Sequence, residues 1–205
     1  MDTKVFLIRH GVTDWHHEGK LLGRRDIPLS EEGLEQARRT AGALAGLQIA
    51  EVLTSPLQRA LQTATLIGQE FNIQIARDHR LTDFEVGHWA GMPLEEIAAS
   101  PQYQEFLSNP LSTHIPEGEN LEQVRQRAVA AIEQALEDNP SGDGIAVITH
   151  SGVIRVLLAH YMGAPPATYH RIRVSPGSIS VLSFSHEHLP RVLACNWSPA
   201  LADLA

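Results

Sequence analysis

The segment KVFLIRHG, residues 4–11, joins a run of apolar residues to an arginine, a histidine and a glycine. Such a run is typical of a buried strand in a parallel sheet. The segment IAVITHSG, residues 145–152, repeats this arrangement far along the chain. Ligands of open α/β sheets bind at the carboxyl ends of the strands, so we expect His10 and His150 to meet at one site there.

Strand patterns alternate with helical patterns on both sides of these two segments. Strands are predicted over Lys4–Ile8, Glu51–Thr54, Ile73–Ala76 and Ile145–Thr149, with an edge strand over Ser178–Phe184. The alternation predicts an α/β fold of three layers, with a mostly parallel central sheet and helices on both faces. The length predicts a single domain over residues 1–205.

Helices are predicted between the strands from apolar residues at helical spacing. One helix is expected to follow Ser30, a second to span residues 124–136, and a third to cover Val153–Tyr161. Another helix is expected to begin with Ser55 as its N-cap, Pro56 in the first helical position and Gln58 completing a capping box.

Residues 78–118 are less regular than the rest of the chain. Glycine and proline interrupt the segment repeatedly, and short helical pieces are predicted near 93–99 and 101–107. We expect this segment to pass over the sheet as a lid-like excursion that covers the site.

Composition limits the classes of partner. The chain is 43% hydrophobic and 20% charged, as in ordinary globular proteins, and its formal net charge of −8 argues against nucleic acid as the main partner. The single cysteine, Cys195, excludes an internal disulfide. With no signal peptide and no apolar run that could span a bilayer, we expect a cytoplasmic protein with no membrane partner. The oligomeric state is left open, a homodimer included.

Four further motifs give the two histidines their context. They are Leu29–Gly33 (LSEEG), Ser55–Ala60 (SPLQRA), Asp83 followed by Gly87–Gly91 (GHWAG), and Val147–Arg155 (VITHSGVIR). Together they resemble the histidine phosphatase superfamily, in its phosphoglycerate mutase-like branch, from about Lys4 to about Leu182. The resemblance implies a phosphoglycerate mutase-like fold, with no metal and no organic cofactor.

The candidate catalytic residues follow from phosphate chemistry. A neutral imidazole can attack phosphorus when its other nitrogen is hydrogen-bonded, and the resemblance makes His10 this phosphate-accepting nucleophile. Arg9 and Arg59 are expected to bind the phosphate, because a guanidinium group can donate two parallel hydrogen bonds to two phosphate oxygens. His150 could donate a hydrogen bond to the phosphoryl group, and the helix that begins at Ser151 offers free N–H groups to an anion.

The leaving group needs a proton, and two carboxylates compete to supply it. Members of the family usually have a glutamate shortly before the Gly-x-Trp-x-Gly stretch, where this chain has Asp83. Glu85, two residues further on, is the rival. We favour Asp83 as the general acid, with Glu85 lining the pocket.

Two departures from the family pattern concern substrate binding. His16 replaces an asparagine that commonly touches phosphate, and Leu22, before Gly23, stands where glutamine is frequent. His16, Leu22 and Gly23 are therefore predicted to line the substrate side of the pocket. Seven further histidines lack the spacing of a zinc site, and most of them are expected to be exposed; they are His16, His17, His79, His88, His114, His186 and His188.

These residues predict a metal-independent phosphatase that hydrolyses a small phosphorylated metabolite through a phosphohistidine. A phosphoglycerate-type mutase is the first alternative, although the short segment between Asp83 and His150 favours water as the acceptor. A catalytically silent member that binds a phosphorylated ligand or a protein is the second. Intact Arg9, His10 and Arg59 argue against this last alternative.

Overall fold

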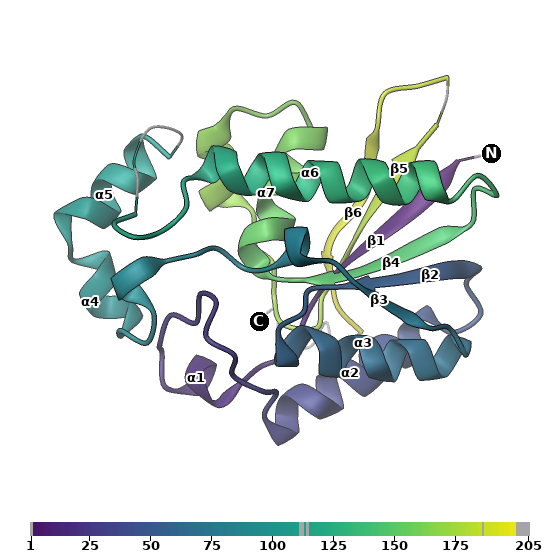
Figure 1. Ribbon diagram of the computed structural model, residues 1–205, viewed down its shortest axis with the longest axis horizontal. Coiled ribbons are helices and arrows are strands. Elements are labelled where there is room, and N and C mark those ends of the chain that lie inside the picture. Colours follow the sequence, from purple (N-terminus) through teal and green to yellow (C-terminus); the bar gives the residue numbers. More distant parts are fainter. Residues whose placement is uncertain (1, 111–112, 114, 186, 200–205) are drawn as a thin grey trace.

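The computed structural model describes residues 2–110, 113, 115–185 and 187–199. A six-stranded sheet forms its centre, in the order β3-β2-β4-β1-β5-β6 (Figure 1). Strands β1 to β4 are mutually parallel, whereas β5 is antiparallel to β1 and to β6. Their bounds are β1 (Thr3–Arg9), β2 (Ile49–Thr54), β3 (Ile75–Arg77), β4 (Gly144–Thr149), β5 (Ile179–Phe184) and β6 (Arg191–Trp197).

Long helices cover both faces of the sheet. Figure 1 shows α2 (Glu31–Leu44) and α3 (Gln58–Phe71) on one face, and α6 (Leu121–Asp138) and α7 (Ser151–Tyr161) on the other. Alternate residues of β1 point into two separate cores, because successive side chains of a strand face opposite sides. Phe6 and Ile8 belong to one core, and Val5 and Leu7 to the other. The predicted α/β class with three layers is confirmed.

The register of β1 and β4 brings the two strand-end histidines together. Arg9 lies opposite Thr149, and the His10 amide donates to the Thr149 carbonyl at 3.1 Å. Both strands therefore end at the same level, and the ring centroids of His10 and His150 are 5.1 Å apart.

The predicted edge strand over Ser178–Phe184 is wrong in its position. β5 lies between β1 and β6, and β6 forms the edge. The sequence does not reveal β6 because its exposed face carries Leu193 and Trp197, so apolar and polar residues do not alternate along it.

The predicted cap at Ser55 is also wrong. Helix α3 begins at Gln58, its N-cap is Leu57, and no side chain caps it. The Ser55 hydroxyl is instead within 2.8 Å of His150 Nε2. The same oxygen accepts from the Leu57 amide at 3.3 Å, so it serves a turn before the helix and a tertiary contact instead of capping the helix.

The irregular segment contains the predicted short helices. They are α4 (Leu94–Ala98) and α5 (Pro101–Ser108), preceded by the 3-10 turns η1 (His79–Leu81) and η2 (Gly87–Trp89). Figure 1 shows α4 and α5 beyond the end of the sheet toward which β1 and β4 run. Two further short elements are α1 (Asp14–His17) and η3 (Pro166–Arg171). In the described part of the chain, no helix is long and apolar enough to cross a membrane.

Candidate active site

A cavity of about 450 Å³ opens where β1 and β4 end. Arg9, His10 and His16 line it from the first strand and its following turn, and Ser151 lines it from the start of α7. Asp83 and residues of α4 and α5 complete its wall. The cavity therefore lies at the carboxyl edge of the sheet, where the sequence predicts the site.

His10 is held as a neutral imidazole with a defined tautomer. Its Nδ1 lies 2.7 Å from the Gly11 carbonyl oxygen, which can only accept, so Nδ1 carries the proton. Its Nε2 accepts from Arg59 Nε at 3.3 Å. Burial, followed by the charges of Arg59 and Arg9, lowers the pKa of His10 well below 6.5. Nε2 is therefore unprotonated, and its electron pair faces Arg59.

Arg59 is fully buried, and the backbone aims it at His10. Its two terminal nitrogens donate to the carbonyls of Arg25 and Gly23, each at 2.7 Å. Gly23 has a φ of +52°, and a Cβ there would meet Val86 Cγ2 at 2.3 Å. Glycine is thus required for the backbone turn that fixes Arg59, and it contributes its carbonyl rather than a side chain.

Arg9 faces the cavity from the end of β1. One terminal nitrogen donates to the Val174 carbonyl at 2.7 Å, and its buried Nε has no partner among the described residues. Burial first, and then the neighbouring Arg155 charge, lower the pKa of Arg9 to about 10. This guanidinium keeps a free donor and has little compensating charge, as expected of an anion site.

Both ring nitrogens of His16 lie against hydrogen-bond donors. Its Nε2 lies 2.8 Å from the second terminal nitrogen of Arg9, and its Nδ1 lies 3.1 Å from the Thr13 amide and 2.9 Å from Thr13 Oγ1. A neutral imidazole carries one N–H, so it can accept at only one of these nitrogens. Burial and the Arg9 charge lower the pKa of His16 to about 3, so it stays neutral. This half-buried ring differs from most of the other histidines.

The predicted exposure of those other histidines holds for His17, His79, His88 and His188, which are exposed. His114 and His186 lie outside the described residues. Among the described residues, no group of three or more histidine, cysteine or acidic side chains is arranged to hold a metal ion.

His150 is fully buried beside His10. Its Nε2 is paired with Ser55 Oγ at 2.8 Å, and its Nδ1 lies 3.5 Å from Asp83 Oδ2 without a hydrogen bond. Burial, followed by the Arg59 charge, lowers the pKa of His150 well below 6.5. The helix α7 begins at the next residue, and Ser151 and Gly152 line the cavity.

The structure brings Asp83, and not Glu85, to the two histidines. Asp83 Oδ2 lies 3.1 Å from the nearest terminal nitrogen of Arg59, and Asp83 lines the cavity. Burial raises the pKa of Asp83 against the opposing effect of Arg59. Glu85 is not part of the cavity lining; its carboxylate accepts from the Gly87 amide at 3.3 Å and lies 3.9 Å from Arg24.

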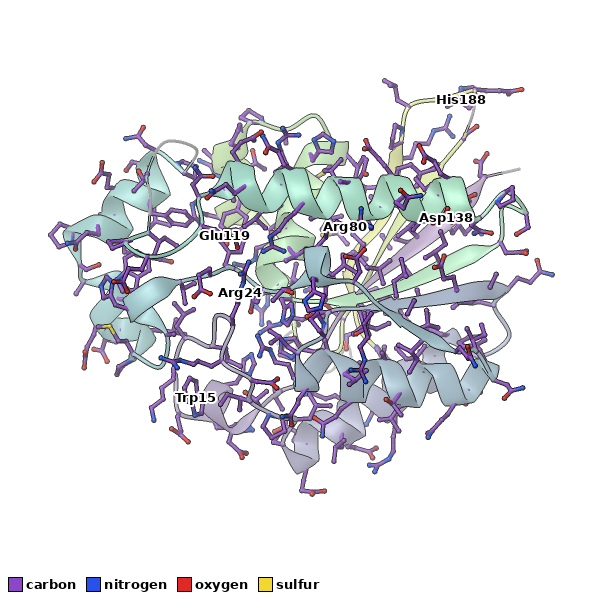
Figure 2. The ribbon with its side chains drawn as sticks, viewed as in Figure 1. Trp15, Arg24, Arg80, Glu119, Asp138 and His188 are labelled. Atoms are coloured by element: carbon purple, nitrogen blue, oxygen red, sulfur yellow. The ribbon has the colours of Figure 1, made fainter. Side chains whose placement is uncertain are left out.

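Two arginines and a glutamate hold the backbone at Asp83, and no local sequence pattern marks them. Arg127 of α6 donates to the carbonyls of Thr82 and Asp83, at 2.5 and 3.1 Å, and Arg24 donates to the same Asp83 carbonyl at 3.1 Å. Glu119 lies 2.9 Å from both arginines and pairs with each. Arg24 and Glu119 are labelled side by side in Figure 2.

Sequence reasoning also missed cavity residues of α7 and η3. Arg155, Tyr169 and His170 line the cavity together with the expected Leu22 and Gly23. Arg155 follows Ser151 by four residues on one helix, and this spacing places both on the same face. That spacing was the available signal for Arg155, whereas nothing local marks η3.

The comparison with protein families covers almost the whole chain. Residues 5–198 match the family model described as the histidine phosphatase superfamily (branch 1). The chain belongs to the histidine phosphatase superfamily. The expected family, its fold and the phosphatase class of enzyme are thereby confirmed.

This histidine phosphatase is similar to curated and solved proteins along most of its length. The probable phosphoglycerate mutase GpmB of Yersinia enterocolitica is 29% identical over 183 residues, which cover 88% of this chain and 85% of that protein. A mycobacterial glucosyl-3-phosphoglycerate phosphatase solved with VO3 is 25% identical, with a TM-score of 0.87 and coverage of 96% and 100%. A phosphoserine phosphatase of Entamoeba histolytica, solved with 3-phosphoglyceric acid, is 25% identical, with a TM-score of 0.87 and coverage of 96% and 98%.

Proposed function

We propose that this histidine phosphatase hydrolyses a small phosphomonoester without a metal ion, through a phosphohistidine on His10. One observation carries the proposal. The hydrogen bond from His10 Nδ1 to the Gly11 carbonyl leaves Nε2 unprotonated beside Arg59, at the wall of the cavity. A neutral, oriented imidazole next to a guanidinium is the arrangement that nucleophilic attack on a phosphoryl group needs.

In the first step the phosphoryl group binds between Arg9, Arg59 and the N–H groups that begin α7. The electron pair of His10 Nε2 forms the bond to phosphorus, and the ester P–O bond breaks. Asp83 gives its proton to the departing oxygen. His150, 5.1 Å from His10 between ring centroids, supports the charge on the phosphoryl oxygens.

In the second step water replaces the alcohol. The Asp83 carboxylate takes a proton from the water, whose oxygen attacks phosphorus while the N–P bond breaks. Inorganic phosphate leaves, and His10 regains its electron pair. Binding of a phosphate dianion raises the pKa of Asp83 further, because like charges favour the neutral acid. The same residue can therefore act as acid first and as base later.

The proposed substrates are small phosphorylated metabolites. The similar phosphatases act, by name, on glucosyl-3-phosphoglycerate and phosphoserine. We propose that residues 78–118 form a lid over the cavity, since Trp89, Ile97 and Phe106 line it from this segment. A cavity of about 450 Å³ has room for one such metabolite.

Rapid quenching with a phosphorus-labelled ester tests the proposal. We expect a phosphoenzyme that is stable in base and labile in acid, formed equally well with a chelator present. His10→Ala should abolish it, whereas His17→Ala, at an exposed position at the end of α1, should not. Label retained in His10→Ala would remove His10 from the mechanism, and loss of turnover with the chelator would indicate a metal.

A phosphoglycerate-type mutase is the second candidate, because the GpmB relatives carry that name. Its phosphoenzyme would return the phosphoryl group to a hydroxyl of the sugar acid rather than to water. Preformed phosphoenzyme mixed with 3-phosphoglycerate distinguishes the two. A phosphatase releases inorganic phosphate, and a mutase forms a bisphosphate.

A further inference from the structure

The start of α3, the helix that carries Arg59, is tied to a distant segment of the chain. The residue before the helix, Leu57, has no side-chain oxygen that could accept from its first amides. The Asp26 carboxylate, 32 positions away from Gln58, accepts from the Gln58 amide at 2.7 Å and from the Gln58 side chain at 3.1 Å. A carboxylate at a helix N-terminus satisfies a free N–H group and interacts favourably with the helix dipole.

A second hydrogen bond ties the same segment to α3 one helical turn further on. The Leu29 amide donates to Gln62 Oε1 at 2.8 Å. Gln58 and Gln62 are four positions apart, so both lie on one face of α3. The two contacts together hold residues 23–29, which we call the 23–29 loop, against the first two turns of the helix.

The 23–29 loop supplies the acceptors that orient Arg59. The terminal nitrogens of Arg59 donate to the carbonyls of Gly23 and Arg25, while its Nε donates to His10 Nε2. The Arg25 carbonyl belongs to the planar peptide group that joins Arg25 to Asp26. Where Asp26 is held therefore determines where this acceptor lies, and with it the direction of the guanidinium.

Asp26 also contributes negative charge near Arg59 without entering the cavity. Burial lowers the pKa of the Arg59 guanidinium, and the charges of Asp83 and then Asp26 oppose this shift. Asp83 lines the cavity, whereas Asp26 is exposed and is not part of the cavity lining. Asp26 can therefore influence the site through Arg59 while remaining out of contact with a molecule bound in the cavity.

We propose that Asp26 is a positioning residue: by holding the 23–29 loop on the start of α3, it keeps the Arg59 guanidinium directed at His10 and at the phosphoryl group. The inference rests on the proposed function and deepens it, because it adds a residue that acts on the same site through another side chain. A contact that only stabilised α3 would leave Arg59 unaffected in the folded enzyme, and this difference can be measured.

Asp26→Ala removes both acceptors of Gln58 and tests the proposal. We expect vanadate, which mimics the five-coordinate transition state, to bind roughly three- to tenfold more weakly, as the loss of one helix-terminal contact allows. The ¹⁵N resonance of His10 Nε2 in the free enzyme should also shift, because its hydrogen bond from Arg59 is weakened. Asp26→Asn keeps an oxygen for the Gln58 amide and should restore most of both properties.

Two controls show whether the effect passes through Arg59. In an Arg59→Ala background, Asp26→Ala should change neither the vanadate affinity nor the His10 resonance any further, because the side chain it positions is absent. Glu31→Ala removes an exposed carboxylate from the first turn of another helix, α2, and should leave both properties as in the natural chain. Gln58→Ala removes only the longer of the two Asp26 contacts and should give a smaller change in the same direction.

A lower unfolding temperature in Asp26→Ala, with unchanged vanadate affinity and an unchanged His10 resonance, would overturn the proposal, because Asp26 would then only stabilise the helix. An equal loss of vanadate affinity in the natural and Arg59→Ala backgrounds would also overturn it. If Asp26→Ala does not fold, Gln58→Ala carries the same test. Failure of the proposed function is distinguishable, because the His10 resonance reports on Arg59 without turnover, even if no phosphoenzyme forms.

Discussion

The charge state of a single side chain, His10, governs whether the site can react. Burial and two neighbouring guanidinium groups remove the proton that an exposed histidine would hold at mildly acidic pH. His150 and His16 are neutral for the same reason. The arginines that we propose to bind phosphate thus also keep His10, the proposed nucleophile, unprotonated.

The pH profile of the enzyme should reflect this neutral nucleophile. Protonation of His10 abolishes attack, and a pKa lowered well below 6.5 moves that loss to lower pH. We therefore expect kcat/KM, which reports the free enzyme, not to fall through an imidazole step near pH 6.5. The second ionisation of the phosphate ester, at about pH 6, also changes kcat/KM, and the pH of that change should differ between esters of different acidity. A fall in kcat/KM at about pH 6.5 that is the same for all esters would contradict the prediction.

The rate loss caused by Asp83→Asn should depend on the leaving group of the ester. Alkyl phosphates need a proton on the departing oxygen, and their hydrolysis should slow by roughly 10²–10⁴-fold. The phenolate of p-nitrophenyl phosphate leaves unaided, so its phosphoenzyme should still form and then hydrolyse slowly. Steady-state rates and quenched phosphoenzyme levels measure the two effects.

Glu85→Gln is the control for that experiment. The carboxylate of Glu85 faces Arg24 and the Gly87 amide and does not line the cavity, so the leaving-group dependence should be unchanged. If the rate loss depended on the leaving group in Glu85→Gln and not in Asp83→Asn, Glu85 would be the general acid.

At the scale of secondary-structure elements, α6 reaches across to hold the backbone at Asp83, the proposed general acid. Arg127 is its contact residue: it donates to the carbonyls of Arg80, Thr82 and Asp83, at 2.7, 2.5 and 3.1 Å. The Arg80 carbonyl lies within η1, whereas Thr82 and Asp83 belong to the stretch without regular structure that follows it, which has no hydrogen-bond ladder of its own. A helix on one face of the sheet therefore fixes a loop above its edge.

Arg127→Met should misplace Asp83 without touching the substrate. We expect kcat for alkyl phosphates to fall by about tenfold or more, with a smaller change for p-nitrophenyl phosphate and little change in KM, because acid catalysis is the step affected. Arg127→Lys should restore part of the rate. An equal loss for both esters would indicate a general structural defect instead.

Arg125→Met provides the matched control on the same helix. Arg125 pairs with Glu122 on the surface of α6, so its loss should leave kcat unchanged and alter stability by no more than the roughly 1 kcal/mol typical of such pairs. Thermal unfolding of all three variants separates stability from catalysis.

At the scale of the whole molecule, one edge of the sheet gathers residues from distant parts of the chain. β1 supplies Arg9, β4 leads to His150, α3 supplies Arg59, and the excursion supplies Asp83 (Figure 1). Parallel strands all end on one side, so each connection can add one group to the site. The apolar wall of α4 and α5 closes the cavity beyond that edge.

Leu94→Asn tests whether that wall contributes binding. Leu94 is 50% exposed and lines the cavity, so the change should not unfold the protein. We expect kcat/KM for esters with a large apolar group to fall by roughly three- to tenfold, from partial loss of apolar burial, and that for methyl phosphate to change little. Leu47→Asn, at a comparably exposed leucine outside the cavity, is the control. Equal losses of kcat/KM for both esters would argue against a lid that contacts the organic group of the substrate.

Local patterns in the sequence determined the layers of the fold and the residues at the strand ends. A strand buried on both faces must be apolar throughout, so β1 and β4 are legible without the structure, and so are the histidines that follow them. Helix α2 is equally local, since Ser30 accepts from the Gly33 amide as a cap does. His10, His150, Arg9 and Arg59 meet because parallel strands end together.

Contacts between distant residues decided the rest. The Ser55 hydroxyl pairs with His150, 95 positions away, and this contact replaces the predicted cap. Asp83 lies beside Arg59 and Glu85 does not, because Arg24 and Arg127 fix the backbone between η1 and η2. The edge strand β6 carries no alternating pattern and is defined by its pairing with β5 alone. Each of these features depends on a contact between residues that are distant in the sequence, and local sequence patterns do not encode such contacts.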